Sequence, residues 1–570
     1  MLDFYSLPKS PDRFMDWSWH EFEPFYQNLN ERPLNEGNIA AWLADWTSLI
    51  DMVSEIQARL TVEVTRDTND KEAERRYNDF LDRIFQKSHT ANHRLKTRLI
   101  SSGLEPQGFI IPLRKMKVEA GIFQEANLPL LSEERKLASR YNKITGSQTV
   151  TWDDKQLTLQ QLRLVLHTPE RATRERAWRL AAERTLEDRA DINNLWVEFM
   201  ALRFRLARNA GCQDYRHYRW SQMTRLDYSP QDCIEFQNAV EEIAVPAATR
   251  VYRNCAERLG VTTLRPWDLD ADLFPVPLSP PTAYGTTHEL QIKVRNTFSK
   301  LDAEFGEYFS IMSHEGCLDL DNNVGKAPGA YCTSFPITRM PYIFMNAVGL
   351  SEDVRTLLHE SGHAFHNFKR FDLPYAQQRI PGLEFAEVAS MSTELLSSPF
   401  ITTANGGFYS PPDADKFLKT HLERILTFWP YMAVVDAFQH WAYTHHEEAS
   451  SPDNCDSKWH QLWKRYIPGV DWSGLKHSAE TGWHRKPHIF RYPFYYIEYG
   501  LAQLGAVQVW RNAQEDPERS LNQFKGALCL GGTASLPDLY KTAGAKFAFD
   551  SQTLGDAVRF IENEIKKLAQ

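Results

Sequence analysis

Apolar residues recur at three- and four-residue steps over most of the chain, a pattern that predicts long amphipathic helices. It is clear from Asp16 to about Leu104, for example in EGNIAAWLADWTSLIDMVSEIQARL, and it returns in HELQIKVRNTFSKLDAEFGEYFSIM and continues toward the C-terminus. Thr168-Pro169-Glu170 predicts the start of an Arg-rich helix that runs to about Ala210, with Thr168 as its N-cap. We therefore expect a mainly α fold.

A few stretches interrupt the helical pattern. Residues 107–118 are expected to be extended, and TVTWDDKQLTL at 149–159 to form a hairpin around Asp153-Asp154. Proline-rich residues 265–285 are expected to form a loop. PGAYCTSFPITRMPYIFMN at 328–346 predicts an edge strand or hairpin, which either pairs with an extended peptide or only covers the helix that follows.

Composition limits the classes of function. The 570 residues are 42% hydrophobic and 24% charged, as in soluble globular proteins, and the net charge of −9 predicts no general affinity for nucleic acid. Without a signal peptide or a long apolar run, we expect a cytoplasmic protein that does not enter membranes. We expect two regions, a helical one with short β elements at 1–195 and a catalytic helical domain at 196–570. The oligomeric state is left open.

Cysteine and arginine give no sign of a separate site. The seven cysteines are an odd number, are widely spread and never form a CxxC pair, so we expect them to be reduced and buried. Any metal site must then use histidine and carboxylate ligands. The arginines between residues 168 and 210 alternate with acids, which favours a solvated, ion-paired helix face.

The stretch TLLHESGHAFH carries the strongest chemical signal. His359 and His363 are four residues apart, so on a helix both ring nitrogens can reach one metal ion. Glu360 lies about 100° further round the helix, which suits a general base beside the metal. Ser351 is expected to cap this helix, with acids in its first turn.

A third ligand must come from elsewhere. Lys369 stands where a metzincin has its third histidine, and His366 would be displaced along the helix axis, so neither fits well. The next predicted helix, EFAEVASMSTELL, carries Glu384, Glu387 and Glu394 near one face. Glu387 is the best third ligand, Glu394 a partner that orients a ligand histidine, and Glu384 the rival.

At this point the chain resembles the thimet oligopeptidase and oligoendopeptidase F group of zinc metallopeptidases, most closely the oligoendopeptidase F branch with its Pz-peptidase-like members. The residues that carry the resemblance are HESGHAFH at 359–366, FAEVASMSTELL at 385–396, PGAYCTSF at 328–335 and HIFRYPFYYIEYG at 488–500. The resemblance implies a large helical fold around a deep substrate channel, and short oligopeptides as substrates.

The resemblance also assigns roles. It implies one Zn²⁺ per chain, held by His359, His363 and Glu387, with Glu360 as the base. It further implies that His488, Tyr496 and Tyr499 hold the substrate carbonyl and the oxyanion. The spacing from His488 is one residue shorter than in the thimet branch, so any of four tyrosines can fill the oxyanion role: Tyr492, Tyr495, Tyr496 and Tyr499.

The function that we expect is that of a zinc metalloendopeptidase. One alternative is a metallocarboxypeptidase on a similar helical HExxH scaffold, which would remove residues from the peptide C-terminus. Another is a non-catalytic metal- or peptide-binding protein, although a structural zinc ion would not require Glu360.

Overall fold

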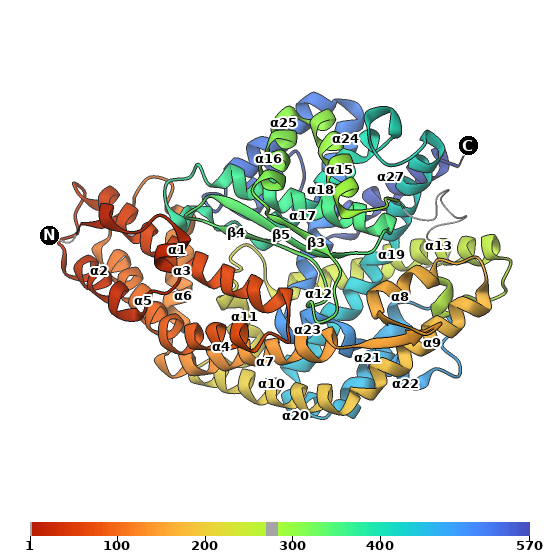
Figure 1. The fold of residues 1–570 in the computed structure, drawn as a ribbon, viewed down its shortest axis with the longest axis horizontal. Coiled ribbons are helices and arrows are strands. Elements are labelled where there is room, and N and C mark those ends of the chain that lie inside the picture. Colours follow the sequence, from red (N-terminus) through yellow and green to blue (C-terminus); the bar gives the residue numbers. More distant parts are fainter. Residues whose placement is uncertain (1–2, 270–282, 570) are drawn as a thin grey trace.

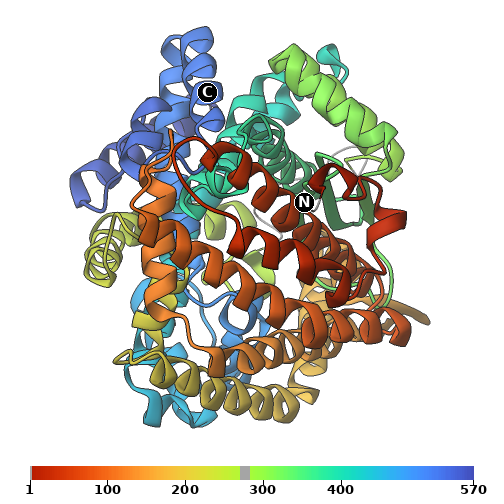
Figure 2. The same cartoon turned by 90° about the vertical axis from the view of Figure 1, so that its left-hand side faces the viewer.

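The computed structural model describes residues 3–269 and 283–569, and its helices far outnumber its five short strands, so the prediction of a mainly α fold is confirmed. The helices of the first 122 residues group at one end of the molecule, at the left of Figure 1 and facing the viewer in Figure 2. In the described ranges no helix is both long and apolar enough to cross a membrane. The division at residue 195 stays a prediction, and residues 270–282 of the expected proline-rich loop lie outside the described residues.

The N-terminal helices share a hydrophobic cluster of their own, built around residues such as Trp42, Trp46 and Phe80. They are α1 (Pro11–Phe14), α2 (Trp19–Glu31), α3 (Ile39–Arg66), α4 (Lys71–Phe80), α5 (Gln86–Ser102) and α6 (Ile110–Ile122). The last of these shows that the extended conformation predicted for 107–118 is wrong. Pro112 is tolerated because it falls in the first turn, where its missing N–H would have no helical partner, and Leu113 and Met116 bury one face.

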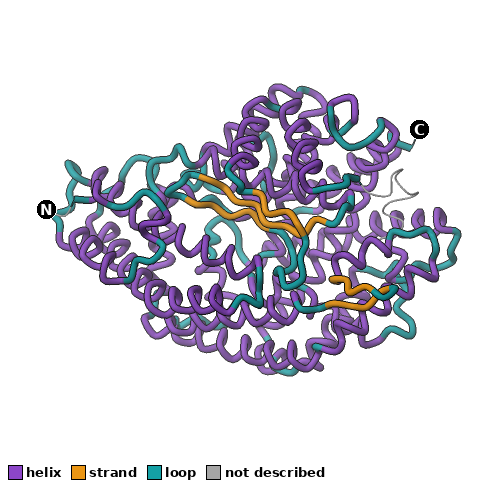
Figure 3. The backbone as a smooth tube through the Cα atoms, in the orientation of Figure 1, coloured by secondary structure: helices purple, strands orange, loops and turns teal. Residues whose placement is uncertain are grey.

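The expected hairpin at 149–159 is confirmed. Strand β1 (Thr149–Trp152) pairs antiparallel with β2 (Lys155–Thr158), and Asp153 and Asp154 turn the chain with φ of 45° and 62°. Both residues take the left-handed conformation that type I′ turns require and that aspartate tolerates. In Figure 3 this hairpin lies apart from the larger sheet.

The Arg-rich stretch differs from its prediction in two respects. It forms two helices, α9 (Arg171–Glu187) and α10 (Arg189–Asn209), and the first is preceded by Glu170 as N-cap, so Thr168 does not cap it. Most of its arginines are partly or fully exposed, but Arg174 and Arg203 are buried. Alternation of charge along a sequence does not tell which single arginine faces the core.

The central sheet has the strand order β3-β5-β4 and runs through the middle of the molecule (Figure 3). Strand β5 (Met340–Ala347) pairs parallel with β3 (Leu318–Asp321) and antiparallel with β4 (Tyr331–Phe335). The β hairpin predicted at 328–346 is therefore present, and β4 is an outer strand of this sheet. Strand β5 leads directly into the helix that carries the two histidines.

The helices of the C-terminal half pack around one large hydrophobic core. Helix α18 (Leu383–Ser397) packs between α17 (Ser351–Arg370) and α24 (Tyr496–Glu515), and α19 (Pro411–Thr444) packs on α24. The helical pattern over HELQIKVRNTFSKLDAEFGEYFSIM corresponds to two helices, because Asp302 caps the second one with its side chain. These are α15 (Thr287–Leu301) and α16 (Ala303–His314).

The remaining helices complete this core and its surface. They are α7 (Leu128–Gly146), α8 (Leu159–Leu166), α11 (Tyr215–Gln222), α12 (Pro230–Ala239), α13 (Val245–Leu259), α20 (His446–Ala449), α21 (Pro452–Tyr466), α22 (Lys476–Glu480), α23 (Pro487–Arg491), α25 (Pro517–Cys529), α26 (Leu536–Thr542) and α27 (Ser551–Lys567). All seven cysteines are free, as expected, but Cys529 is exposed and Cys212 and Cys332 are only half-buried.

Candidate metal centre

The HExxH helix is capped by an acid rather than by Ser351 as predicted. Asp353 Oδ2 accepts hydrogen bonds from the backbone N–H groups of Val348, Gly349 and Leu350, while Ser351 is the first helical residue. This carboxylate ties the N-cap residue Leu350 and the two residues before it to the first turn, and its charge complements the helix dipole. The helix is thereby joined firmly to the end of β5.

Two histidines and one glutamate converge on a single point. His359 Nε2 lies 3.3 Å from Glu387 Oε2, and His363 Nε2 lies 3.4 Å from the same oxygen. These three atoms form a group that could hold a metal ion. Because tetrahedral zinc bonds of about 2.0–2.1 Å place ligand atoms roughly 3.3–3.4 Å apart, the residues fit this ion.

A glycine allows the two ligand helices to approach this closely. A Cβ atom on Gly362 of α17 would lie 2.5 Å from Ser390 Cα and 2.7 Å from Ala389 O of α18. Only glycine fits at such a contact between backbones. Glu387 is one turn before Ser390, so the contact at Gly362 brings Glu387 to the face that carries His359 and His363.

Neighbouring groups orient the three candidate ligands. Glu394 Oε1 lies 2.6 Å from His359 Nδ1, which leaves Nε2 of that ring for the metal. Burial lowers the pKa of His359, but hydrogen bonds with Glu387 and Glu394 outweigh it and raise the pKa well above its usual value. Burial raises the pKa of Glu387, yet the neighbouring histidines bring it below the usual range. The acid therefore stays ionised, as a ligand must.

Glu360 stands apart from these contacts. It is buried, and its Oε2 atom has no hydrogen-bond partner among the described residues. Burial raises the pKa of Glu360, opposed by the charges of His359 and His363. A buried carboxylate oxygen without a partner, beside two candidate metal ligands, is available to accept a proton.

The segment from His488 to Tyr499 brings a second set of polar groups. His488 Nε2 lies 3.1 Å from the Tyr499 hydroxyl, and Lys486 donates to the Tyr496 hydroxyl over 3.2 Å. Burial lowers the pKa of His488 to about 3 and raises that of Tyr496 to about 12, and burial also raises the pKa of Tyr499 well above its usual value. At neutral pH the imidazole is therefore neutral and both phenols keep their protons.

Tyr495 has a contact that the sequence did not single out. Its hydroxyl donates to Glu387 Oε1 over 2.5 Å, while Glu387 Oε2 faces the histidines. Tyr495 thus orients the carboxylate of Glu387. Tyr492 is 44% exposed, and its hydroxyl accepts a hydrogen bond from Arg491. The spacing of the four tyrosines along the sequence does not tell which of them contacts Glu387 and which is exposed.

The rival ligands lie elsewhere. Glu384 accepts a hydrogen bond from the Tyr228 hydroxyl over 2.5 Å and lies 3.6 Å from Arg225. His366 packs its ring against Phe385. The structure therefore brings Glu387, and neither Glu384 nor His366, to the pair His359 and His363.

Another buried group of metal-ligand type consists of Cys233, Asp436 and His440. Arg216 Nη1 lies 3.3 Å from His440 Nδ1, and a guanidinium can only donate. His440 then carries its proton on Nε2, 3.4 Å from Asp436, and has no lone pair there for a metal ion. The Asp436 carboxylate accepts a hydrogen bond from Gln237 Nε2 over 2.7 Å, so this group is a weaker candidate than His359, His363 and Glu387.

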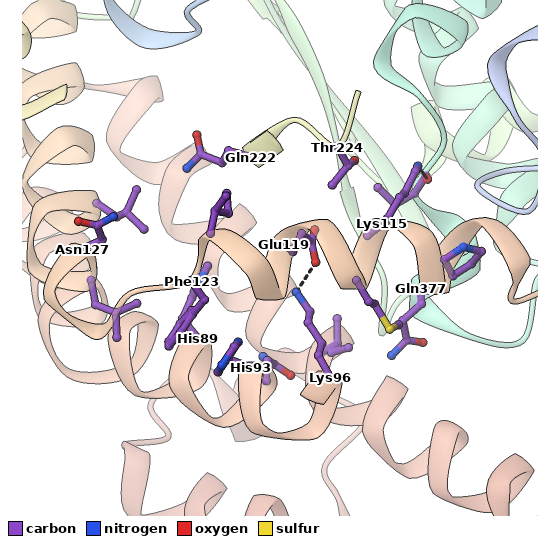
Figure 4. Close-up of a pocket in the computed structure, with 18 of the residues that line it drawn as sticks. His89, His93, Lys96, Lys115, Glu119, Phe123, Asn127, Gln222, Thr224 and Gln377 are labelled. Carbon is purple, nitrogen blue, oxygen red and sulfur yellow. Dashed lines mark hydrogen bonds and ion pairs between the residues drawn. The ribbon is translucent and has the colours of Figure 1, made fainter. Parts of the chain in front are cut away.

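Two of the cavities among the described residues are relevant to a binding site. One of about 490 Å³ adjoins the metal centre and has His359, His488 and Tyr499 in its wall, with Phe428 and Trp463 among its apolar residues. The other, of about 370 Å³, lies between the N-terminal helices and the connection that follows α17. Figure 4 shows its polar groups, including the pair Lys96 and Glu119, and none of the centre's residues lines it.

Comparisons with known proteins give matches to peptidases. Residues 164–556, more than two thirds of the chain, match Peptidase family M3. Oligopeptidase PepF of Bacillus subtilis is 24% identical over 279 residues, which are 47% of this chain and 40% of PepF, so the match spans less than half of that curated relative.

Two solved structures resemble the whole chain. An X-ray structure of an oligoendopeptidase F has a TM-score of 0.91 and 26% identity, and the match covers 99% of each chain. A structure of Pz peptidase A with an inhibitor has the same TM-score of 0.91 at 24% identity, with 99% of each chain covered. The second likeness supports the fold alone.

Proposed function

The chain belongs to peptidase family M3, and from this premise we propose that it is a zinc-dependent endopeptidase that hydrolyses internal bonds of short oligopeptides. The observation that carries the proposal is the convergence of His359, His363 and Glu387 beside the unpartnered carboxylate oxygen of Glu360. One zinc ion per chain would be held by the first three residues. A location in the cytoplasm, and a region boundary near residue 195, remain part of the proposal.

The protein side chains supply proton transfer and orientation. When bound, the zinc ion supplies a Lewis acid that lowers the pKa of water and polarises a carbonyl group. Glu360 accepts a proton from the attacking water and passes it to the amine that leaves. Glu394 and Tyr495 hold His359 and Glu387 in the orientation that binding requires.

The pair of His488 and Tyr499 stabilises the negative oxygen that forms when the peptide carbonyl is attacked. For Tyr499 to donate its proton to that oxygen, His488 Nε2 must carry a hydrogen and donate to the Tyr499 hydroxyl, 3.1 Å away. Tyr496, held by Lys486, positions the peptide. Each good donor in such a site contributes roughly 3–4 kcal/mol to the barrier reduction.

Substitution of the base tests the proposal. Glu360→Gln should lower kcat roughly 10²–10⁴-fold, since a general base contributes that much, while elemental analysis still finds one zinc ion per chain. Glu515→Gln, at an exposed position at the end of α24, is the matched control and should leave activity unchanged. An active Glu360→Gln protein would exclude this mechanism.

Product analysis separates the endopeptidase from the metallocarboxypeptidase. A peptide blocked at both ends is cut internally by the first and resists the second. Mass spectrometry of the products, with and without a chelator, decides between them. Wild-type protein that binds zinc but cuts neither blocked nor free peptides would favour the non-catalytic alternative.

A further inference from the structure

Three arginine side chains hold the backbone between His488 and Tyr495. Arg203 of α10 donates to the carbonyls of Ile489 and Phe490, the first bond being 3.2 Å long. Arg219 Nε of α11 donates to Pro493 O over 3.2 Å. Arg225 Nη2, three residues after α11, donates to Phe494 O over 2.5 Å. Four carbonyl groups of one short segment thus accept from guanidinium groups.

This segment contains a strained residue directly before the tyrosines. Phe494 has a φ of 64°, the left-handed conformation that a bulky side chain rarely adopts. Its N–H donates to Gln439 Oε1 over 2.7 Å, its carbonyl accepts from Arg225, and its ring is fully buried. Such a conformation persists only where the surroundings determine it on several sides.

Arg225 links the strained residue to the helix that carries the phenols. The same Nη2 atom that binds Phe494 O donates to Glu498 Oε1 of α24 over 2.7 Å. The guanidinium also stacks over Trp220, 4.3 Å from the ring centroid, and is almost completely buried. Tyr495 and Tyr499 lie in sequence directly beside these two anchor points, one residue after Phe494 and one residue after Glu498.

We propose that Arg225, supported by Arg203 and Arg219, is a positioning residue that places Tyr495 against Glu387 and Tyr499 against His488. The inference rests on the proposed function and adds the groups that set the geometry of its oxyanion site. For Arg203 this role differs from the solvated, ion-paired helix face that the alternating charges of residues 168–210 predict.

The hydrogen bonds of Tyr495 and Tyr499 depend on accurate placement of their hydroxyl groups. The Tyr495 hydroxyl lies 2.5 Å from Glu387 Oε1, and the Tyr499 hydroxyl 3.1 Å from His488 Nε2. A misplacement of about 1 Å breaks such bonds and can cost roughly 10²-fold in rate. A merely structural arginine would instead lower stability without acting through one particular tyrosine.

A double-mutant cycle on the zinc-loaded protein tests the inference. Lysine at position 225 keeps the charge and the donors, but it lacks the planar guanidinium that stacks on Trp220 and so fixes the place of the nitrogen that donates to Phe494 O and Glu498. Arg225→Lys should lower kcat at least tenfold with KM unchanged, and Tyr499→Phe should lower it roughly 10²–10³-fold. If Arg225 acts through Tyr499, the double variant is no slower than Tyr499→Phe alone. A double variant slowed by the product of both factors, or an unaffected Arg225→Lys, would overturn the inference.

A second variant covers the case in which the Arg225 variant does not fold. Arg219 is only partly buried, so Arg219→Gln should fold, and its smaller loss of kcat should also vanish in the Tyr499→Phe background. If Arg219→Gln has no effect, or an effect that persists in that background, the inference fails.

Arg205→Lys is the matched control. Arg205 lies on α10, the helix of Arg203, and is exposed, so kcat should be unchanged. Failure of the inference differs from failure of the proposed function. An inactive wild-type protein refutes the function. An active wild-type protein in which the arginine and Tyr499 substitutions lower kcat independently refutes only the positioning role.

Discussion

Gly362→Ala tests whether the metal centre depends on direct backbone contact between α17 and α18. The added Cβ would lie 2.5 Å from Ser390 Cα, 2.7 Å from Ala389 O and 2.9 Å from Thr393 Oγ1. The Thr393 side chain can turn away, but the first two atoms belong to the backbone of α18. Since carbon atoms in contact normally stand about 3.5–4.0 Å apart, the two helices have to separate locally by roughly 1 Å.

The magnitude follows from the ligand geometry. His359 and His363 lie on one helix and Glu387 on the other, with the ligand atoms 3.3 and 3.4 Å apart. A metal site tolerates errors of only about ±0.2 Å in its bond lengths, so a separation near 1 Å should weaken zinc binding by more than ~100-fold. Overpacking should also lower the free energy of unfolding of the metal-free protein by about 1–3 kcal/mol.

Competition titration with a chromogenic chelator measures the zinc affinity, and urea unfolding of metal-free protein measures stability. Gly526→Ala is the matched control, because Gly526 lies within helix α25 and its added Cβ would meet no atom within 4 Å. That variant should keep the zinc affinity and gain about 0.5–1 kcal/mol of stability. If Gly362→Ala bound zinc as tightly as wild type and unfolded at the same urea concentration, the close contact between α17 and α18 would be refuted.

Three further predictions concern the surroundings of the centre and the stability of the fold. Glu394→Gln removes the charged partner of His359 Nδ1 and should lower zinc affinity about 10–100-fold in the same titration, and an unchanged affinity would contradict the orienting role. Tyr495→Phe removes the hydrogen bond to Glu387 and should also weaken zinc binding, roughly tenfold. Tyr499→Phe should instead lower kcat and leave the zinc affinity unchanged. The reverse pattern would mean that the two tyrosines are assigned wrongly. Burial raises the pKa of Glu304, but hydrogen bonds from Lys369, Tyr308 and Lys525 outweigh it and bring the pKa down to about 2. Because this pKa is below the usual value of 4.5, the ionised carboxylate stabilises the fold above that pH and loses its effect as the pH falls toward 2. The advantage of wild type over Glu304→Gln in urea unfolding of metal-free protein should therefore shrink below about pH 4.5, and an advantage that stays constant down to about pH 3 would disprove the assignment.

Much of the local structure could be predicted because it depends on neighbours in the chain. The four-residue spacing of His359 and His363, the hairpin at Asp153-Asp154 and the strands at 328–346 each follow from short-range patterns, and the structure contains them. The extended conformation predicted for 107–118 was wrong because β-favouring residues in a short run do not outweigh a helix that buries Leu113 and Met116.

The sequence by itself determined the HExxH pair, the helix that carries it and the small set of acids and tyrosines from which partners had to come. The tertiary structure decided among them: Glu387 rather than Glu384 at the histidines, and Tyr495 against Glu387 rather than free in the cavity. The physical reason is that a helix presents residues three and four apart on nearly the same face. Which of them meets the histidines depends on how closely α17 and α18 pack at Gly362, and on where buried arginines hold the segment before α24.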